Sequence, residues 1–199
     1  MLKREEKEHK ITILLISTNK HKVEEINNIT ARYGVIVVPA NIRKMEIQSD
    51  NLVEIALMAA RSAYSSLRKP LIVEDAGLFI KELNGFPGPY SSYVYRTIGC
   101  KGILKLLEGI KRRDAYFKSV IVYKDESYEM VFEGLTEGEI AYDIRGSGGF
   151  GFDPIFIPKG YNKTFAEMSL EEKNRLSHRG KAVKKFIEWF IENRKHAFK

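Results

Sequence analysis

The sequence has 199 residues, of which 44% are hydrophobic and 30% charged. This balance is typical of a globular domain and excludes a disordered chain. The longest apolar runs, such as residues 13–16, are far too short to cross a membrane, and the charged extension at residues 1–10 lacks the apolar centre of a signal peptide. The length of the chain predicts one domain, residues 1–199. The single cysteine, Cys100, excludes an internal disulfide, so we expect the protein in the cytoplasm.

The formal charge of +7 favours an anionic partner, either a phosphorylated small molecule or a nucleic acid. A nucleic-acid partner is the weaker of the two, because no basic stripe is interleaved with aromatic residues as in a known binding module.

The first half of the chain alternates between apolar runs and helical spacing of apolar residues. In chain order these predict a strand, a helix, a strand, an extended piece, a helix and a strand, at residues 11–16, 23–33, 35–38, 42–47, 52–67 and 71–80. The polar turn at residues 17–22 lies where backbone N–H groups at a helix start can face an anion, and Lys22 would add a cation. The alternative is an ordinary helix cap by Ser17 or Thr18, with solvated lysines.

Two adjacent acids, Glu74 and Asp75, interrupt the apolar run at residues 71–80. Neighbouring carboxylates repel each other and resist burial unless a cation or hydrogen-bond donors compensate. We therefore predict that the strand ends at an acidic site with a turn at Gly77. A shaped loop at residues 85–92 follows, too rich in Gly and Pro for a helix. Glu46 is expected at the surface unless the fold brings it near these acids.

The second half predicts a short helix, an antiparallel hairpin, two further strands and two helices. The predicted ranges are 101–108 for the first helix, 115–123, 128–132, 135–144 and 155–157 for the strands, and helices starting after Ser169 and after Gly180.

A glycine-rich loop at residues 145–154 contains the ingredients of a purine pocket. Phe150 and Phe152 offer ring faces, and Asp153 offers an acceptor for ring N–H groups. The alternative is a tight connection between strands. Further on, Lys173, His178 and Arg179 either end a helix or face a ligand.

The combination of an anion-facing turn, paired acids, a glycine-aromatic loop and a cationic cluster suits a nucleoside triphosphate with a divalent cation. Without a His/Cys cluster, oxygen ligands favour Mg²⁺ or Mn²⁺.

Five motifs in order resemble those of the inosine triphosphate pyrophosphatase family, the non-canonical purine nucleoside triphosphate pyrophosphatases. They are the Ser/Thr-x-Asn-x-x-Lys, Asp/Glu-Asp-Ser/Thr-Gly-Leu, Pro-Gly-x-Tyr-Ser, Gly-Phe/Tyr-Gly-Phe/Tyr-Asp-Pro and Lys-Asn-x-x-Ser-His-Arg motifs, at residues 17–22, 74–78, 87–91, 149–154 and 173–179. The resemblance extends from about Ile11 to the last helix.

The resemblance implies hydrolysis of ITP, dITP and XTP to the monophosphate and pyrophosphate. It also implies an elongated two-lobed α/β fold, with a central mixed β-sheet flanked by helices and the substrate between the lobes. A homodimer and Mg²⁺, with Mn²⁺ as a possible substitute, are implied as well. Asp75 would be the catalytic base, and Glu46, Glu74 and Asp75 would be candidate metal ligands. The implied substrate contacts are Ser17, Thr18, Asn19, Lys20, His21, Lys22, Ala76, Phe150, Gly151, Phe152, Asp153, Lys173, His178 and Arg179.

One residue departs from the motifs: Ala76 stands where the family usually has Ser or Thr. A substrate contact there would use the backbone N–H of Ala76, so we expect the activity to be modified but not lost. Three alternatives stay open at this stage. They are a related pyrophosphatase for other modified triphosphates, a nucleotide sensor without turnover, and a basic nucleic-acid binder.

Overall fold

The computed structural model describes residues 10–195, so nearly all of the predicted extension at 1–10 lies outside the described residues. One mixed sheet runs along the molecule in the order β2-β1-β3-β5-β6-β7, with β4 paired to β3. The strands are β1 (Ile11–Leu15), β2 (Val35–Pro39), β3 (Leu71–Ile80), β4 (Pro87–Gly88), β5 (Asp114–Lys124), β6 (Glu129–Ile140) and β7 (Phe156–Pro158). β1 is parallel to β2 and β3, and the other pairs are antiparallel.

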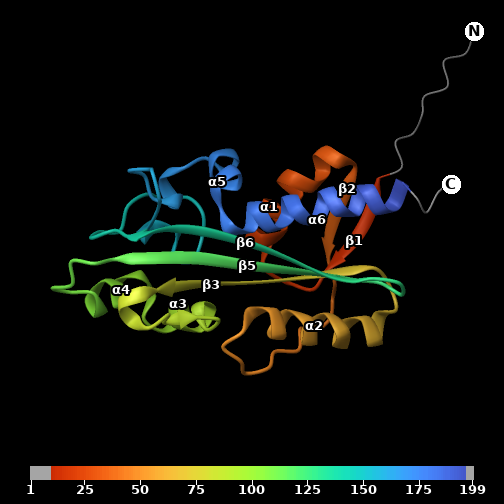
Figure 1. The fold of residues 1–199 in the computed structure, drawn as a ribbon, viewed down its shortest axis with the longest axis horizontal. Helices are drawn as coiled ribbons and strands as arrows, with labels where there is room; N and C mark the ends of the chain where they lie inside the picture. Colours follow the sequence, from red (N-terminus) through yellow and green to blue (C-terminus); the bar gives the residue numbers. More distant parts are fainter. Residues whose placement is uncertain (1–9, 196–199) are drawn as a thin grey trace, which may run out of the picture.

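Helices cover both faces of this sheet. They are α1 (Lys20–Thr30), α2 (Leu52–Leu67), α3 (Ser91–Thr97), α4 (Gly99–Leu106), α5 (Leu170–Leu176) and α6 (His178–Lys195). Figure 1 shows α1, α5 and α6 on one side of the sheet and α2, α3 and α4 on the other. The long strands β3, β5 and β6 therefore connect two lobes.

Three apolar clusters fill the two lobes. In the lobe that holds β1 and β2, one cluster packs α1 and α6 on the sheet, and a second packs α2 on the opposite face. In the other lobe, a third cluster joins the far ends of β3 and β5 to α4 and β7. The predicted elongated, two-lobed α/β fold with a mixed sheet is confirmed.

The predicted turn at Gly77 was wrong, because β3 continues unbroken from Leu71 to Ile80 and pairs with β5 throughout. Gly77 is needed for a different reason. A Cβ atom there would lie 2.3 Å from the backbone oxygen of Gly88, so glycine lets β4 cross close to β3. The acidic pair therefore lies in the middle of a strand and not at its end.

The predicted break between two strands near Gly134 was also wrong, since β6 runs through it. A Cβ atom on Gly134 would lie 2.0 Å from the carbonyl oxygen of His178, so this glycine lets α6 approach the sheet. Likewise Gly180 lies inside α6, not before it, against the backbone of Asn174. In each case the glycine makes room for a neighbouring backbone.

Two irregular stretches also differ from expectation. The loop predicted at residues 85–92 ends two residues early, because Ser91 and Ser92 already belong to α3, a helix that was not predicted from the sequence. The extended piece predicted at residues 42–47 pairs with no strand among the described residues and belongs to the connection between β2 and α2, residues 40–51. This connection and the turn after β1 both leave the carboxyl ends of parallel strands, the edge where open α/β sheets bind ligands.

Candidate active site

The polar turn after β1 contains Asn19, the residue that caps α1. The Asn19 side chain accepts hydrogen bonds from the backbone N–H groups of His21 and Lys22, at 3.0 and 3.3 Å. The alternative interpretation had Ser17 or Thr18 as the capping residue, but neither of them caps α1. Lys22 is not solvated either, because its Nζ lies 2.7 Å from Oε2 of Glu74. The turn therefore brings an amide-rich helix start and a cation to the middle of β3.

The middle of β3 has an open edge. On this edge β1 covers Leu71 and Ile72, and β4 covers Leu78 and Phe79. Between them, the carbonyl of Glu74 accepts a hydrogen bond from Lys22 Nζ at 3.1 Å.

Backbone groups on a strand alternate between its two edges. The carbonyl of Ile72 accepts from Ile16, and the N–H of Leu78 donates to Ser91 Oγ, both at this edge. The backbone N–H of Ala76 therefore points to the same edge, which is what a substrate contact without the missing hydroxyl requires.

Glu74 lies at the centre of a buried chain of charges. Oε1 accepts from Ser119 Oγ at 2.6 Å and from Arg179 Nε at 3.0 Å. Glu25 continues the chain, bonding Arg179 Nη1 and Lys173 Nζ, both at 2.5 Å. Lys173 also donates to Asp153 at 2.5 Å. The chain joins three cations to three carboxylates, and it connects α1, β3, α5 and α6.

Within this buried chain of charges, each group's pKa depends on its charged neighbours. Burial opposes ionisation of Glu74, but Arg179 and Lys22 outweigh it and hold the pKa of this carboxyl well below its usual range. Burial likewise opposes the charge on Glu25, and Arg179 and Lys173 lower its pKa. For Asp153 burial prevails over Lys173 and raises the pKa.

Asp75 lies on the opposite face of β3 from Glu74, because side chains alternate along a strand. Its Oδ1 forms an ion pair with Lys44 of the connection 40–51. Its Oδ2 is buried without a hydrogen-bond partner among the described residues. Glu46 lies nearby, with Oε1 4.0 Å from Lys44 Nζ, although its side chain is 74% exposed.

The predicted metal ligands therefore separate into two groups. Asp75 and Glu46 approach the same Lys44 ammonium, and their oxygen atoms are the donors that Mg²⁺ takes. The unpaired oxygen of Asp75 fits such an ion. The Glu74 carboxylate, the third candidate ligand, lies on the other face of β3 and bonds Lys22, Arg179 and Ser119. Within residues 10–195, no group of three or more His, Cys, Asp or Glu side chains is arranged to hold a metal ion.

The glycine-rich loop presents Phe150 to the turn after β1. The Phe150 ring stacks on His21 with centroids 5.2 Å apart, and Lys173 and Arg179 lie 4.9 and 5.2 Å from its centroid. Asp153 stabilises the loop, since its Oδ2 also accepts a hydrogen bond from the backbone N–H of Phe150 at 2.7 Å. Phe152 is buried in the apolar cluster of the second lobe, and Gly151 has φ +64°, which favours glycine.

His178 is buried and stacks on Phe117, with ring centroids 4.5 Å apart. Burial, aided by Arg179, lowers its pKa well below the usual range, so this imidazole is neutral near pH 7. Nδ1 has no hydrogen-bond partner among the described residues. Of the cationic cluster predicted from sequence, His178 is thus a neutral polar group, while Lys173 and Arg179 carry the charges.

Sequence reasoning missed four residues of this region: Glu25, Lys44, Phe117 and Ser119. Glu25 follows Lys22 by three residues on one helix face, a spacing that could have suggested its role. The other three carry no sequence signal, because only the pairing of β3 with β5 and the course of the connection 40–51 bring them to the site.

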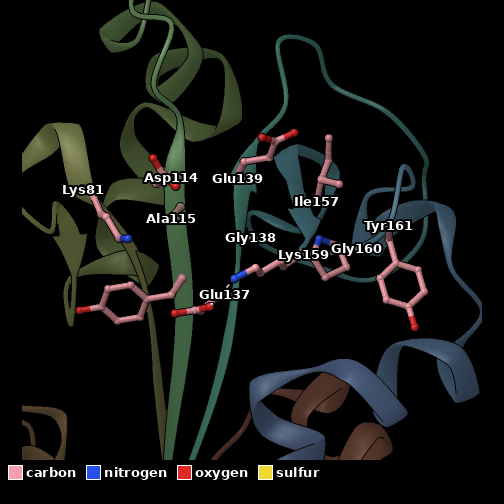
Figure 2. Close-up of a pocket in the computed structure, with 12 residues that line it drawn as sticks. Lys81, Asp114, Ala115, Glu137, Gly138, Glu139, Ile157, Lys159, Gly160 and Tyr161 are labelled. Carbon is pink, nitrogen blue, oxygen red and sulfur yellow. Dashed lines mark hydrogen bonds and ion pairs between the residues drawn. The ribbon is translucent and has the colours of Figure 1, made fainter.

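A hollow of about 360 Å³ lies elsewhere, over the far ends of β5, β6 and β7. Figure 2 shows Lys159 reaching toward Glu137 across it, and their charged atoms lie 3.4 Å apart. Both side chains are mostly exposed. Glu137 pairs with Tyr116 of β5, which in turn pairs with Phe79, four residues along β3 from Asp75. We assign this solvated hollow no part in the acidic site.

The fold and this site define a class: an α/β protein with an anion-facing turn, a buried charge chain and a separate acidic face at one open strand edge. The chain belongs to the Ham1 family, whose profile matches residues 13–189. The resemblance drawn from the sequence motifs is thereby confirmed.

Curated relatives and solved structures of this family are similar to the protein over most of its length. A dITP/XTP pyrophosphatase of Hyperthermus butylicus is 54% identical over 177 residues, 89% of this chain and 93% of the relative. A dITP/XTP pyrophosphatase of Thermococcus kodakarensis is 50% identical, covering 92% and 99%. The structure of a HAM1 protein from Coxiella burnetii superposes with a TM-score of 0.82 at 31% identity, covering 92% of this chain and 99% of that one. Among the described helices, none is both long and apolar enough to span a membrane.

Proposed function

We propose that this protein hydrolyses the non-canonical purine nucleoside triphosphates ITP, dITP and XTP to the monophosphate and pyrophosphate. The observation that carries the proposal is Asp75: a half-buried carboxylate with one unpaired oxygen, in mid-strand beside an anion-facing turn. Relatives named dITP/XTP pyrophosphatases support it. The reaction belongs to the hydrolases that act on phosphoric anhydrides.

In the proposed reaction Asp75 accepts a proton from the water that attacks the α-phosphorus. The positive end of α1, where Asn19 Oδ1 shares the His21 and Lys22 N–H groups, and the Lys22 ammonium would face the phosphates and stabilise the negative charge of the leaving pyrophosphate. Asp75 and Glu46 would hold Mg²⁺, for which Mn²⁺ could substitute, and the ion would neutralise phosphate charge. Ser17 and Thr18 complete the turn around the phosphates.

The base would lie against Phe150. Phe150 offers a ring face, and the Ala76 backbone N–H, His178 and Asp153 offer polar contacts. A site that bonds a 6-oxo group and N1–H rejects adenine, in which donor and acceptor are reversed.

A substrate panel tests the proposal. Pyrophosphate release is measured with ITP, dITP, XTP, ATP, GTP and modified pyrimidine triphosphates, with and without Mg²⁺. We expect turnover of the first three, dependence on Mg²⁺, and at most weak turnover of ATP. Preference for a pyrimidine triphosphate over ITP would overturn the substrate class.

Two other outcomes favour different functions. Saturable ITP binding without pyrophosphate release in Mg²⁺ would indicate a nucleotide sensor. Tight, salt-sensitive binding of RNA or DNA without turnover would indicate a nucleic-acid binder.

The proposal includes a homodimer in the cytoplasm. Large apolar side chains are exposed together around α3, namely Phe86, Tyr90, Tyr93, Tyr95 and Ile98, a surface suited to a second copy of the chain. The free, buried Cys100 suits a reducing compartment. Sedimentation equilibrium measures the mass, and a monomer at micromolar concentration would contradict the dimer; cell fractionation tests the location.

A further inference from the structure

Lys44 occupies the position between the two carboxylates proposed to hold the metal. Its ammonium pairs with Oδ1 of Asp75 and lies 4.0 Å from Oε1 of Glu46. The side chains of Lys44 and Asp75 are only 16% and 15% exposed, so solvent screens this pair less than a surface pair. The ammonium and a divalent cation therefore require the same two carboxylates.

We propose that Lys44 is a built-in competitor for the divalent cation. In the free protein it neutralises Asp75 and keeps the carboxylate in place, and metal binding displaces its ammonium. This inference rests on the proposed function, because it concerns the metal ligands of the same site. Lys44 is thus a positioning residue that acts through Asp75.

Electrostatics make the exchange necessary. Two like charges about 4 Å apart repel each other, and the repulsion is several-fold stronger in a partly buried site than in bulk water. A divalent ion bound to Asp75 would double this repulsion with the ammonium. Lys44 must therefore leave its present position when the ion binds, and its departure weakens the measured metal affinity.

The chain around Lys44 permits this movement. Within the described residues, no backbone–backbone hydrogen bond holds residues 41–48. Hydrogen bonds fix the connection on either side of this stretch, at Ala40, whose N–H donates to the carbonyl of Leu15, and at Asn51, which caps α2. Within the stretch, Ile42 packs against the apolar cluster under α2. A change in the Lys44 side chain or its local backbone breaks no strand or helix hydrogen bond.

A purely structural ion pair makes the opposite prediction. If Lys44 only held Asp75 in the geometry that binds metal, removing the ammonium would loosen Asp75 and weaken metal binding. A competitor gives stronger metal binding when it is removed. The direction of the change in affinity separates the two roles.

The experiment measures Mn²⁺ binding to the nucleotide-free protein by the loss of the free-ion electron paramagnetic resonance signal. For Lys44→Met we expect a dissociation constant at least about five-fold lower than wild type, a lower bound because two unit charges about 4 Å apart already give roughly this factor in water and the ion carries two charges. Lys44→Arg keeps the cation and should bind Mn²⁺ within about two-fold of wild type. Lys159→Met, the matched control, loses a lysine–carboxylate pair in the remote hollow and should bind as wild type does.

Thermal unfolding provides a second readout. Without metal, Lys44→Met should unfold at a lower temperature than wild type, since Asp75 loses its counter-charge. Saturating Mn²⁺ should raise the midpoint more in Lys44→Met than in wild type, because tighter binding adds more stability. Lys44→Gln repeats both measurements if the methionine variant does not fold.

Equal or weaker Mn²⁺ binding by Lys44→Met or Lys44→Gln overturns the inference. The proposed metal site itself is tested separately by Asp75→Asn. If wild type binds Mn²⁺ and Asp75→Asn does not, the metal site is supported, and a negative result for the Lys44 variants then contradicts only the competitor role of Lys44. If wild type shows no saturable binding, both the metal site and its competitor are wrong.

Discussion

Glu74 and Asp75 are neighbours in sequence, but strand alternation puts their side chains in different environments. Glu74 faces α6, where Lys22, Arg179 and Ser119 satisfy it within a balanced chain of charges. Asp75 faces the connection 40–51, where one loop lysine pairs with it and one oxygen has no described hydrogen-bond partner. Each carboxylate has one buried oxygen without a geometric hydrogen bond, but that of Glu74 lies 2.7 Å from the Lys22 ammonium, whereas that of Asp75 has no ion-pair partner among the described residues. The comparison teaches that a carboxylate with both oxygens paired to neighbours supports structure, whereas one with an oxygen left over keeps capacity for chemistry. The predictions below test this division.

Asp75→Asn should have the largest effect. Loss of the general base should lower kcat for ITP by about 10²- to 10⁴-fold. The unfolding temperature should stay close to that of wild type, because the charge left unpaired is then the Lys44 ammonium, on a stretch that no backbone–backbone hydrogen bond holds among the described residues. Pyrophosphate release and calorimetry measure the two quantities. A variant that keeps activity would remove Asp75 from the chemistry.

Glu25→Gln should mainly affect stability. Removing one carboxylate from the buried chain leaves Lys173 and Arg179 undercompensated, and such a loss costs about 3–5 kcal/mol of the free energy of unfolding. Urea denaturation measures this cost. The control is Arg61→Ala, which breaks an exposed ion pair with Glu129 and should leave the midpoint almost unchanged. Equal effects of the two substitutions would contradict the structural role of the buried chain.

The pH dependence of stability should report the buried ion pairs of Glu74. Because the folded-state pKa of Glu74 is lowered, its contribution is present above the ordinary value of 4.5 and is lost as pH falls below it. In that range the unfolded chain takes up a proton that the folded protein does not, which lowers stability by at most about 1.4 kcal/mol per pH unit. Unfolding of Glu74→Gln between pH 5 and 3 should therefore depend less on pH than that of wild type. Equal slopes would argue against the lowered pKa.

Ala76→Ser should have the smallest effect. A hydroxyl at the open edge of β3 adds one hydrogen bond to substrate, worth about 0.5–1.5 kcal/mol. We expect the KM for ITP to fall by about two- to ten-fold, with kcat nearly unchanged. Steady-state kinetics of both proteins test this. An increase in KM would show that the backbone N–H alone is the better contact.

Much of the fold follows from local pattern. Apolar spacing predicted α2 and the strand at residues 115–123 close to their observed limits, and the Ser169 and Glu172 capping box marked the start of α5. The errors at Gly77, Gly134 and Gly180 have one cause. A glycine that turns the chain and a glycine that admits a neighbouring backbone look alike in sequence, and only the position of the neighbour distinguishes them.

For the site, the sequence by itself determined the chemical groups: an Asn-capped turn with Lys22, two adjacent acids, a glycine-aromatic loop and a Lys/His/Arg cluster. Tertiary structure alone decided how these groups divide. The continuous β3 sends Glu74 into a buried chain with Glu25 and leaves Asp75 facing Lys44. The reason is that the energy of a charge depends on the partners and solvent around it, and these come from segments that are distant in sequence.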